Sequence, residues 1–220
     1  MKEFAIFDLD GTLLNTIDDL GHAANYALQT NGFPTHGIAV YPFFVGNGVR
    51  KLIERTLPED NRDTETVEHL LKDFKTYYNE HNTDFTKPYA GIPELLHSLT
   101  DKGVRLAVAS NKYQLATSKI ISHFFPDIDF VAVVGHNEGY PTKPDPSIVF
   151  EILGKAQVAK AKTVYIGDSG IDMETARRAC IDSIGVTWGF RSEKELIKSY
   201  AVRIVHSPSE ILDLIDNDRL

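Results

Sequence analysis

The stretch Phe4-Ala5-Ile6-Phe7-Asp8-Leu9-Asp10-Gly11-Thr12 decides how the rest of this chain is interpreted. Its apolar first half is typical of a strand that is buried on both faces, and Gly11 allows a tight turn directly afterwards. Open α/β sheets bind ligands at the carboxyl ends of their strands. The stretch therefore predicts a pair of carboxylates, Asp8 and Asp10, at a ligand-binding edge, although aspartates before a glycine can also simply cap a turn.

Beyond residue 88 the hydrophobic pattern alternates between strands and helices. We expect strands at 104–109, 130–134, 163–166, 184–186 and 203–205. We expect helices at 93–102, 113–125, 146–153, 172–179, 192–199 and 209–215. Such strict alternation predicts an α/β fold with a doubly wound parallel sheet.

Residues 15–82 show only helical periodicity. Helices are expected at 16–30, where Thr16 and Asp19 form a variant of the capping box, at 49–56 and at 64–79. Because one strand precedes this block and the others follow it, we expect an all-helical domain at 15–84. It would be inserted into a core domain formed by 1–14 and 85–220, with hinges at 13–16 and 81–88.

Charge and hydropathy argue against several classes of function. The net charge of −8 argues against a nucleic-acid-binding surface, which is usually basic. No apolar stretch approaches the ~18 residues of a membrane span, and the N-terminus lacks the shape of a signal peptide. Cys180 is the single cysteine; we expect it to be a small buried residue. A chain without an intrachain disulfide fits a cytoplasmic protein.

Polar residues follow the other strands in the same way as they follow the first one. They are Ser110 and Asn111 after the strand at 104–109, Lys143 in the loop after the strand at 130–134, Asp168 after the strand at 163–166, and Asp172 one turn later. The carboxyl ends of parallel strands share one edge of the sheet. We therefore expect these side chains to meet Asp8 and Asp10.

This set of side chains suits phosphoryl transfer. Clustered carboxylates repel one another and need a metal ion or shared protons. Ligands that are all oxygen favour Mg²⁺ over Zn²⁺. A site that combines Mg²⁺, a lysine and backbone donors can stabilise a phosphoryl group in transfer, and a carboxylate can itself be the nucleophile that forms an aspartyl phosphate.

In this order the motifs resemble those of the haloacid dehalogenase (HAD) superfamily, in phosphatases with a helical C1-type cap inserted after the first strand. The motifs are Asp8-Leu9-Asp10-Gly11-Thr12, Ser110, Lys143, and Gly167-Asp168-Ser169 with Asp172. A closer likeness to the phosphoglycolate phosphatase group is carried by residues 45–52, Ser110-Asn111-Lys112 and Trp188-Gly189-Phe190-Arg191. The resemblance implies a Rossmann-like core.

The resemblance also implies a role for each residue of the site. Asp8 is expected to be the nucleophile, and Asp10 the general acid that protonates the leaving oxygen and then the base that activates water. Ser110 and Asn111 are expected to hold phosphate oxygens, and Lys143 to neutralise charge beside Asp8.

The resemblance also implies which four residues hold Mg²⁺. These are Asp8, the backbone carbonyl of Asp10, Asp168, and Asp172, which would bind the ion either directly or through a partner. Asp172 could also be a helix N-cap. Asn15 departs from the aspartate often found at its position.

Substrate-binding residues in the helical insertion are open to two interpretations. Gly46, Asn47 and Arg50 could contact the substrate, whereas Arg50 could equally belong to a solvated cationic face. Lys112 has the same two alternatives, a residue of the site or a solvated lysine at the start of a helix.

The function expected from these observations is that of a Mg²⁺-dependent phosphatase, monomeric or homodimeric, acting on a small phosphorylated metabolite. A phosphomutase or phosphotransferase of the same fold is one alternative, although similar mutases usually carry Ser-x-Ser where this chain has Ser110-Asn111-Lys112. A non-enzymatic phospho-aspartate switch is the other, although such domains lack a cap and have no need of Asp10.

Overall fold

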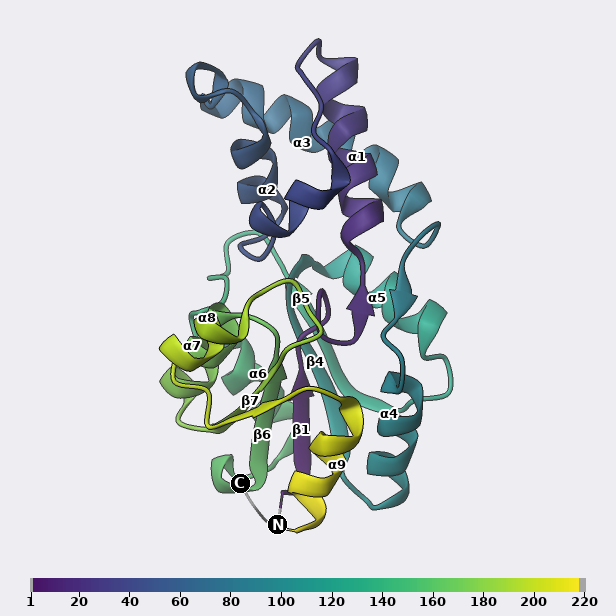
Figure 1. Ribbon diagram of the computed structural model, residues 1–220, viewed down its shortest axis with the longest axis vertical. Coiled ribbons are helices and arrows are strands. Elements are labelled where there is room, and N and C mark those ends of the chain that lie inside the picture. Colours follow the sequence, from purple (N-terminus) through teal and green to yellow (C-terminus); the bar gives the residue numbers. More distant parts are fainter. Residues whose placement is uncertain (1, 218–220) are drawn as a thin grey trace.

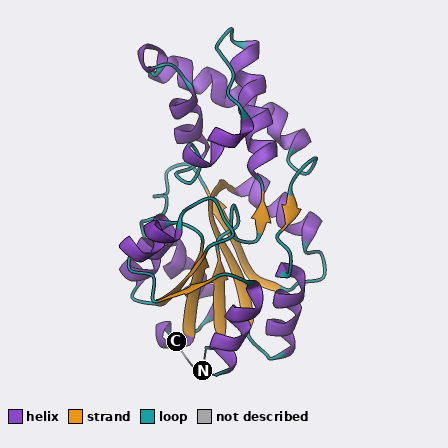
Figure 2. Cartoon of the chain, in the orientation of Figure 1, coloured by secondary structure: helices purple, strands orange, loops and turns teal. Residues whose placement is uncertain are grey.

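A computed structural model describes residues 2–217 of the chain, and a parallel sheet lies at its centre (Figures 1 and 2). Its strands are β1 (Phe4–Phe7), β4 (Arg105–Tyr113), β5 (Phe130–His136), β6 (Thr163–Gly167), β7 (Asp182–Val186) and β8 (Arg203–Val205). Their order across the sheet is β5-β4-β1-β6-β7-β8. At the middle of the sheet Phe7 pairs with Val108 and Ile166, so β1, β4 and β6 end close together.

Helices cover both faces of this sheet. They are α4 (Ile92–Asp101), α5 (Gln114–Phe124), α6 (Ser147–Ala156), α7 (Gly170–Ala179), α8 (Glu193–Lys198) and α9 (Pro208–Asp216). Along β1, Ala5 and Phe7 belong to one hydrophobic cluster, whereas Phe4 and Ile6 belong to another on the opposite face. The predicted α/β fold with a doubly wound parallel sheet is therefore confirmed.

The inserted segment consists of α1 (Ile17–Thr30), η1 (Ile38–Phe43), α2 (Val49–Thr56), η2 (Glu59–Asn61) and α3 (Thr64–His81). Figure 1 shows these helices as a layer beyond the carboxyl ends of the strands. Two short strands, β2 (Leu14–Asn15) and β3 (Lys87–Pro88), pair antiparallel where the chain enters and leaves the layer. The boundaries expected at 15–84 lie next to this pair of linkers and stay a prediction.

The predicted capping box at Thr16 is wrong. The Thr16 side chain caps no backbone group of α1; its hydroxyl donates instead to Asp10 Oδ1 over 2.6 Å. The Asp19 carboxylate accepts from the backbone N–H groups of Phe85 and Thr86 at 3.0 and 2.9 Å. Both side chains therefore bond to segments outside α1 and not to the backbone of its first turn.

Two further expectations need correction. The strand expected at 104–109 runs on to Tyr113, with irregular pairing after Ala109, so Ser110 and Asn111 lie within β4 and not after it. Cys180 is exposed, because it ends α7 in a left-handed conformation, with φ 58°, one residue beyond the face that packs on the sheet. None of the described helices has both the length and the apolar composition needed to cross a membrane.

Candidate active site

One cavity lies between the carboxyl edge of the sheet and the inserted helices. Its lining includes seven of the residues that the sequence placed in the core part of the site: Asp8, Asp10, Ser110, Asn111, Lys143, Asp168 and Asp172. The helical layer supplies mainly apolar side chains, among them Leu20, Leu52 and Phe74. The cavity therefore has a charged floor and a largely apolar roof.

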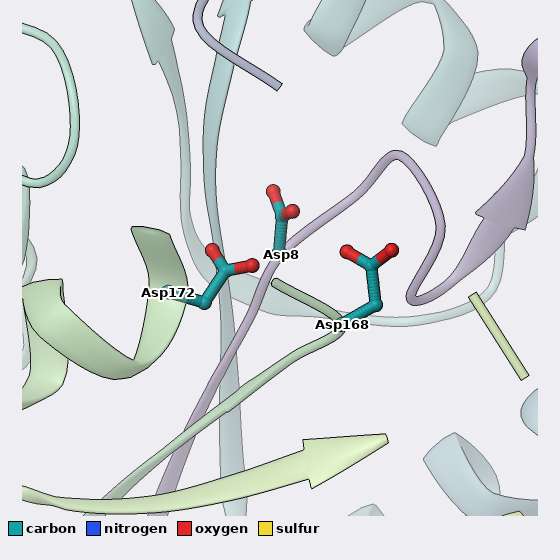
Figure 3. A group of neighbouring side chains, drawn as sticks. All are labelled: Asp8, Asp168 and Asp172. Carbon is teal, nitrogen blue, oxygen red and sulfur yellow. The ribbon is translucent and has the colours of Figure 1, made fainter. Parts of the chain in front are cut away.

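Three buried carboxylates form the floor (Figure 3). Asp8 follows β1 and Asp168 follows β6, whereas Asp172 lies in the first turn of α7. Each offers an oxygen, and these atoms lie within 4.8 Å of one another. Three segments that are far apart in sequence are thus brought to one point because the parallel strands end at the same edge.

Burial and mutual repulsion change the proton affinity of this cluster. Burial, and then the negative charge of Asp172, raises the pKa of Asp8 from 3.8 to about 7, against the opposing effect of Lys143. Burial, and then the charges of Asp172 and Asp8, raises the pKa of Asp168 well above its ordinary value. A carboxylate cluster that holds protons this tightly is also one in which a divalent cation is stabilising.

The donors of the cluster fit Mg²⁺, because they are hard oxygen atoms. Asp8 and Asp168 each keep one carboxylate oxygen that accepts no hydrogen bond from the described residues, whereas both oxygens of Asp172 have protein partners. Asp172 Oδ2 accepts from the N–H and the hydroxyl of Ser169 in a capping box of α7. Asp172 is therefore at the third helical position, and Ser169 is the N-cap.

Lys143 lies at the centre of the charged floor. Its ammonium group is 2.8 Å from Asp8 Oδ1 and 2.7 Å from Asp172 Oδ1, and it donates to the carbonyl of Ala109 over 3.0 Å. Burial alone would lower its pKa, but the charges of Asp172 and Asp8 raise the pKa of Lys143 well above its ordinary value. Lys143 is therefore a fixed cation that holds one oxygen of Asp8.

Two side chains, those of Thr16 and Lys112, hold Asp10, and neither contact was predicted from the sequence. Its Oδ1 atom accepts from the Thr16 hydroxyl and lies 3.1 Å from the ammonium of Lys112. Lys112 in turn donates to the hydroxyl of Tyr78, on α3, over 2.7 Å. Lys112 is only 6 % exposed, so the alternative that it is a solvated lysine at a helix start is wrong.

Ser110 and Asn111 differ in what they can still offer to a ligand. The Ser110 hydroxyl oxygen accepts from the Lys112 N–H at 3.2 Å, which leaves its O–H free to donate. The Asn111 amide is occupied: its oxygen accepts from the Lys143 N–H, and its nitrogen donates to the carbonyls of Lys143 and Gly46. A phosphate at Asn111 would have to use its backbone N–H.

Of the three residues expected to bind substrate in the inserted segment, the structure brings only Gly46 to the cavity. The Asn47 side chain accepts from Arg55 over 2.6 Å. Arg50 pairs with Glu68 on the half-exposed outer side of α2 and α3. Asn47 and Arg50 therefore have partners elsewhere, and the placement of Arg50 matches the alternative of a solvated cationic face.

The loop after β7 contributes residues for which the sequence predicted no role in the site. The Phe190 N–H donates to Asp168 Oδ2 over 2.7 Å, and Arg191 lines the cavity. This loop leaves the sheet at the same carboxyl edge as the other site residues. Its position after the strand expected at 184–186 was a signal that could have placed it there.

Comparisons with known proteins agree with this geometry. A sequence model described as haloacid dehalogenase-like hydrolase matches residues 5–186. A phosphoglycolate phosphatase from Aquifex aeolicus is 30 % identical over 212 residues, which cover 96 % of this chain and 96 % of that protein. One from Mesorhizobium japonicum is 32 % identical over 191 residues, which cover 86 % and 84 % respectively.

A solved structure also matches closely. A protein from Lactobacillus delbrueckii subsp. bulgaricus has a TM-score of 0.89 and 36 % identity, with 96 % of this chain and 97 % of that chain covered. The resemblance inferred from the four motifs is thus confirmed, both for the superfamily and for the phosphoglycolate phosphatase-like group. This chain belongs to the haloacid dehalogenase-like hydrolase family.

Proposed function

We propose that this protein is a Mg²⁺-dependent phosphatase that hydrolyses a small phosphate monoester, phosphoglycolate or a similar metabolite, through an aspartyl phosphate on Asp8. The observation that carries the proposal is the buried cluster of Asp8, Asp168 and Asp172, with Lys143 against it and Asp10 in the same cavity. The relatives named phosphoglycolate phosphatase support the class of substrate.

Asp8 and Asp168 would hold the Mg²⁺ ion with the backbone carbonyl of Asp10, while Asp172 orients Lys143 and remains close enough to join them. When bound, the ion would neutralise charge on the phosphoryl group and the carboxylates.

In the first step Asp8 acts as the nucleophile. One of its carboxylate oxygens attacks the phosphorus, and the bond from phosphorus to the leaving oxygen breaks. Asp10 gives its proton to that oxygen, and the alcohol departs. Lys143 keeps the Asp8 carboxylate oriented and offsets its charge, since its ammonium lies 2.8 Å from Oδ1.

In the second step Asp10 works in reverse. It takes a proton from a water molecule, the water oxygen attacks the phosphorus of the aspartyl phosphate, and the bond from phosphorus to Asp8 breaks. Inorganic phosphate leaves, and both aspartates return to their starting states. Thr16 and Lys112 hold Oδ1 of Asp10, so Oδ2 remains the oxygen available to carry the proton.

We propose that residues 15–84 act as a cap on a core made of 1–14 and 85–220. The paired linkers β2 and β3 and the apolar roof over the charged floor support this division. A cap that closes would exclude water from the phosphoryl group. We further propose that the protein is a monomer or homodimer and that it works in the cytoplasm. The free thiol of its single cysteine, Cys180, fits a reducing compartment.

The decisive experiment compares Asp10→Ala on two kinds of leaving group. An alkoxide needs a general acid, which contributes ~10²–10⁴-fold, whereas nitrophenolate leaves without help. At saturating Mg²⁺ the variant should lose most of its phosphorylation rate on alkyl phosphates and keep much of it on para-nitrophenyl phosphate. With the nitrophenyl ester it should then release a burst of about one nitrophenolate per site and stall as a phosphoenzyme.

The matched control is Asp129→Ala, the same change at an exposed aspartate, which should behave as the wild type. Equal losses on both kinds of substrate, or steady turnover without a burst, would contradict the role of Asp10. Transfer of phosphate to a sugar acceptor would point to a mutase, and a stable phosphoenzyme in the wild type would point to a phospho-aspartate switch.

A further inference from the structure

The segment from Pro42 to Gly46 contributes Val45 and Gly46 to the roof of the cavity. Three of its carbonyl groups accept hydrogen bonds from side chains outside the inserted helices, whereas the carbonyl of Phe44 accepts from Arg55 of α2. One terminal nitrogen of the Arg191 guanidinium donates a hydrogen bond to the carbonyl of Pro42. The other donates to the carbonyl of Val45 over 2.8 Å. Asn111 donates to the carbonyl of Gly46 over 3.1 Å. Two side chains of the sheet domain therefore hold three carbonyls of the helical layer.

The loop that carries Arg191 is itself fixed to the floor of the site. The Trp188 indole N–H donates to the carbonyl of Thr12 over 3.0 Å, and the Phe190 N–H donates to Asp168. Gly189 packs so closely that a Cβ there would lie 2.3 Å from both Asp168 Cβ and the carbonyl oxygen of Gly11. Arg191 thus extends from a loop that is tied to the floor, and its guanidinium bonds to the inserted segment.

Among the described residues, Arg191 forms only a long ion pair, with Glu195. Glu195 is 3.8 Å away, beyond hydrogen-bond distance, and its Oε1 already accepts from the Gly170 N–H at 2.9 Å. The Arg191 side chain is 17 % exposed, and its guanidinium donates to the carbonyls of Pro42 and Val45 instead. Its planar fork suits two acceptors at once, which a lysine ammonium on a flexible stem matches poorly.

We propose that Arg191 is a positioning residue that holds the segment 42–46 in place over the reacting groups. It would act through the roof and not on the phosphate, and so would set how tightly a substrate is enclosed. This inference rests on the proposed function only where activity is measured. The position of the roof segment can be followed without any substrate.

The test combines hydrogen exchange with kinetics on Arg191→Ala and Arg191→Lys. The N–H groups of Phe44 and Val45, which donate to the carbonyl of Tyr41, should exchange about tenfold faster or more in Arg191→Ala, because each charged hydrogen bond to the segment is a strong one. KM should rise about 10- to 100-fold with a much smaller change in kcat. Arg191→Lys, which can hold one carbonyl, should be intermediate in both measurements.

Arg105→Ala is the matched control, because Arg105 also donates to a backbone carbonyl, that of Ala156, but far from the cavity. It should change neither the exchange of Phe44 and Val45 nor KM. Unchanged exchange in Arg191→Ala would overturn the inference, and so would a loss confined to kcat or a lysine variant as impaired as the alanine one. Asn111 is unsuitable for this test because it also holds Lys143.

These readouts separate the two proposals. If the wild type hydrolyses no phosphate monoester, the proposed function fails while the exchange experiment still decides the role of Arg191. If the wild type is active and the exchange of the roof segment does not respond to Arg191→Ala, the inference fails and the proposed function stands.

Discussion

Replacing Gly189 by alanine would press a methyl group against Asp168. The Cβ of the new side chain would lie 2.3 Å from Asp168 Cβ, 2.4 Å from Asp168 Oδ2 and 2.3 Å from the carbonyl oxygen of Gly11. The φ angle of Gly189 is not in the left-handed region, so alanine meets no backbone strain there. Any effect of Gly189→Ala must therefore come from the close contact.

The size of the effect follows from these distances. Ordinary contacts between non-bonded carbon atoms are about 3.5–4.0 Å, so the new methyl group must push its neighbours away by roughly 1 Å. Asp168 is the softer neighbour, because the other one is the backbone of Gly11. A misplacement of about 1 Å can cost ~10²-fold in rate, and overpacking typically costs about 1–3 kcal/mol of stability.

We therefore expect Gly189→Ala to weaken Mg²⁺ binding about 10- to 100-fold and to lower kcat/KM by a similar factor. Calorimetric titration with Mg²⁺ and the Mg²⁺ dependence of turnover would measure the two effects. Gly154→Ala is the control, because Gly154 lies in α6 and the added Cβ would meet no described atom within 4 Å beyond its own stretch of helix. It should leave Mg²⁺ binding unchanged. Wild-type Mg²⁺ affinity in Gly189→Ala would refute the role of Asp168 as a ligand.

Three further outcomes are expected. Asp8→Asn keeps the shape of the nucleophile and removes its chemistry, so turnover should fall to background with an unchanged Tm and no phosphate trapped on the protein; retained turnover would move the nucleophile elsewhere. Chelation with EDTA should abolish activity and Mg²⁺ should restore it, whereas full activity in metal-free buffer would exclude the mechanism. Because the pKa of Asp8 is raised from 3.8 to about 7 in the folded protein, the folded state holds this proton more tightly than the unfolded state. The free energy of unfolding of the metal-free protein should therefore fall as pH rises from about 4 to about 7, and saturating Mg²⁺ should reduce that fall. Urea denaturation across this range would measure it, and stability that rises with pH there would contradict the assignment.

Much of the core of this protein could be predicted from local sequence. A strand buried on both faces must be apolar along its whole length, and the turn after it must be polar, so Asp8 and Asp168 were visible as strand ends. The periodicity of the inserted helices was equally visible, since each needs one apolar stripe. Cys180 was misplaced because the side on which a helix-ending residue projects depends on its backbone conformation, which has no signal in residue type.

Partners across the cavity could not be predicted, because they depend on how the helical layer sits on the sheet. Lys112 has the same local sequence whether it faces water or Asp10, and only the approach of Tyr78 from α3 decides between them. Arg50 shows the converse case, since its position in α2 turns it toward Glu68 and away from the cavity.

Hydrophobic period and strand-end polarity are local properties, so the order of strands and helices along the chain and the groups at the carboxyl edge could be predicted from the residues. The tertiary structure alone decided which of those groups touch. Lys143 lies against Asp8 and Asp172, the amide of Asn111 bonds to backbone groups, and Arg191 bonds to the roof segment. Buried polar and charged groups need partners, and the packing of the two layers decides which partners are within reach.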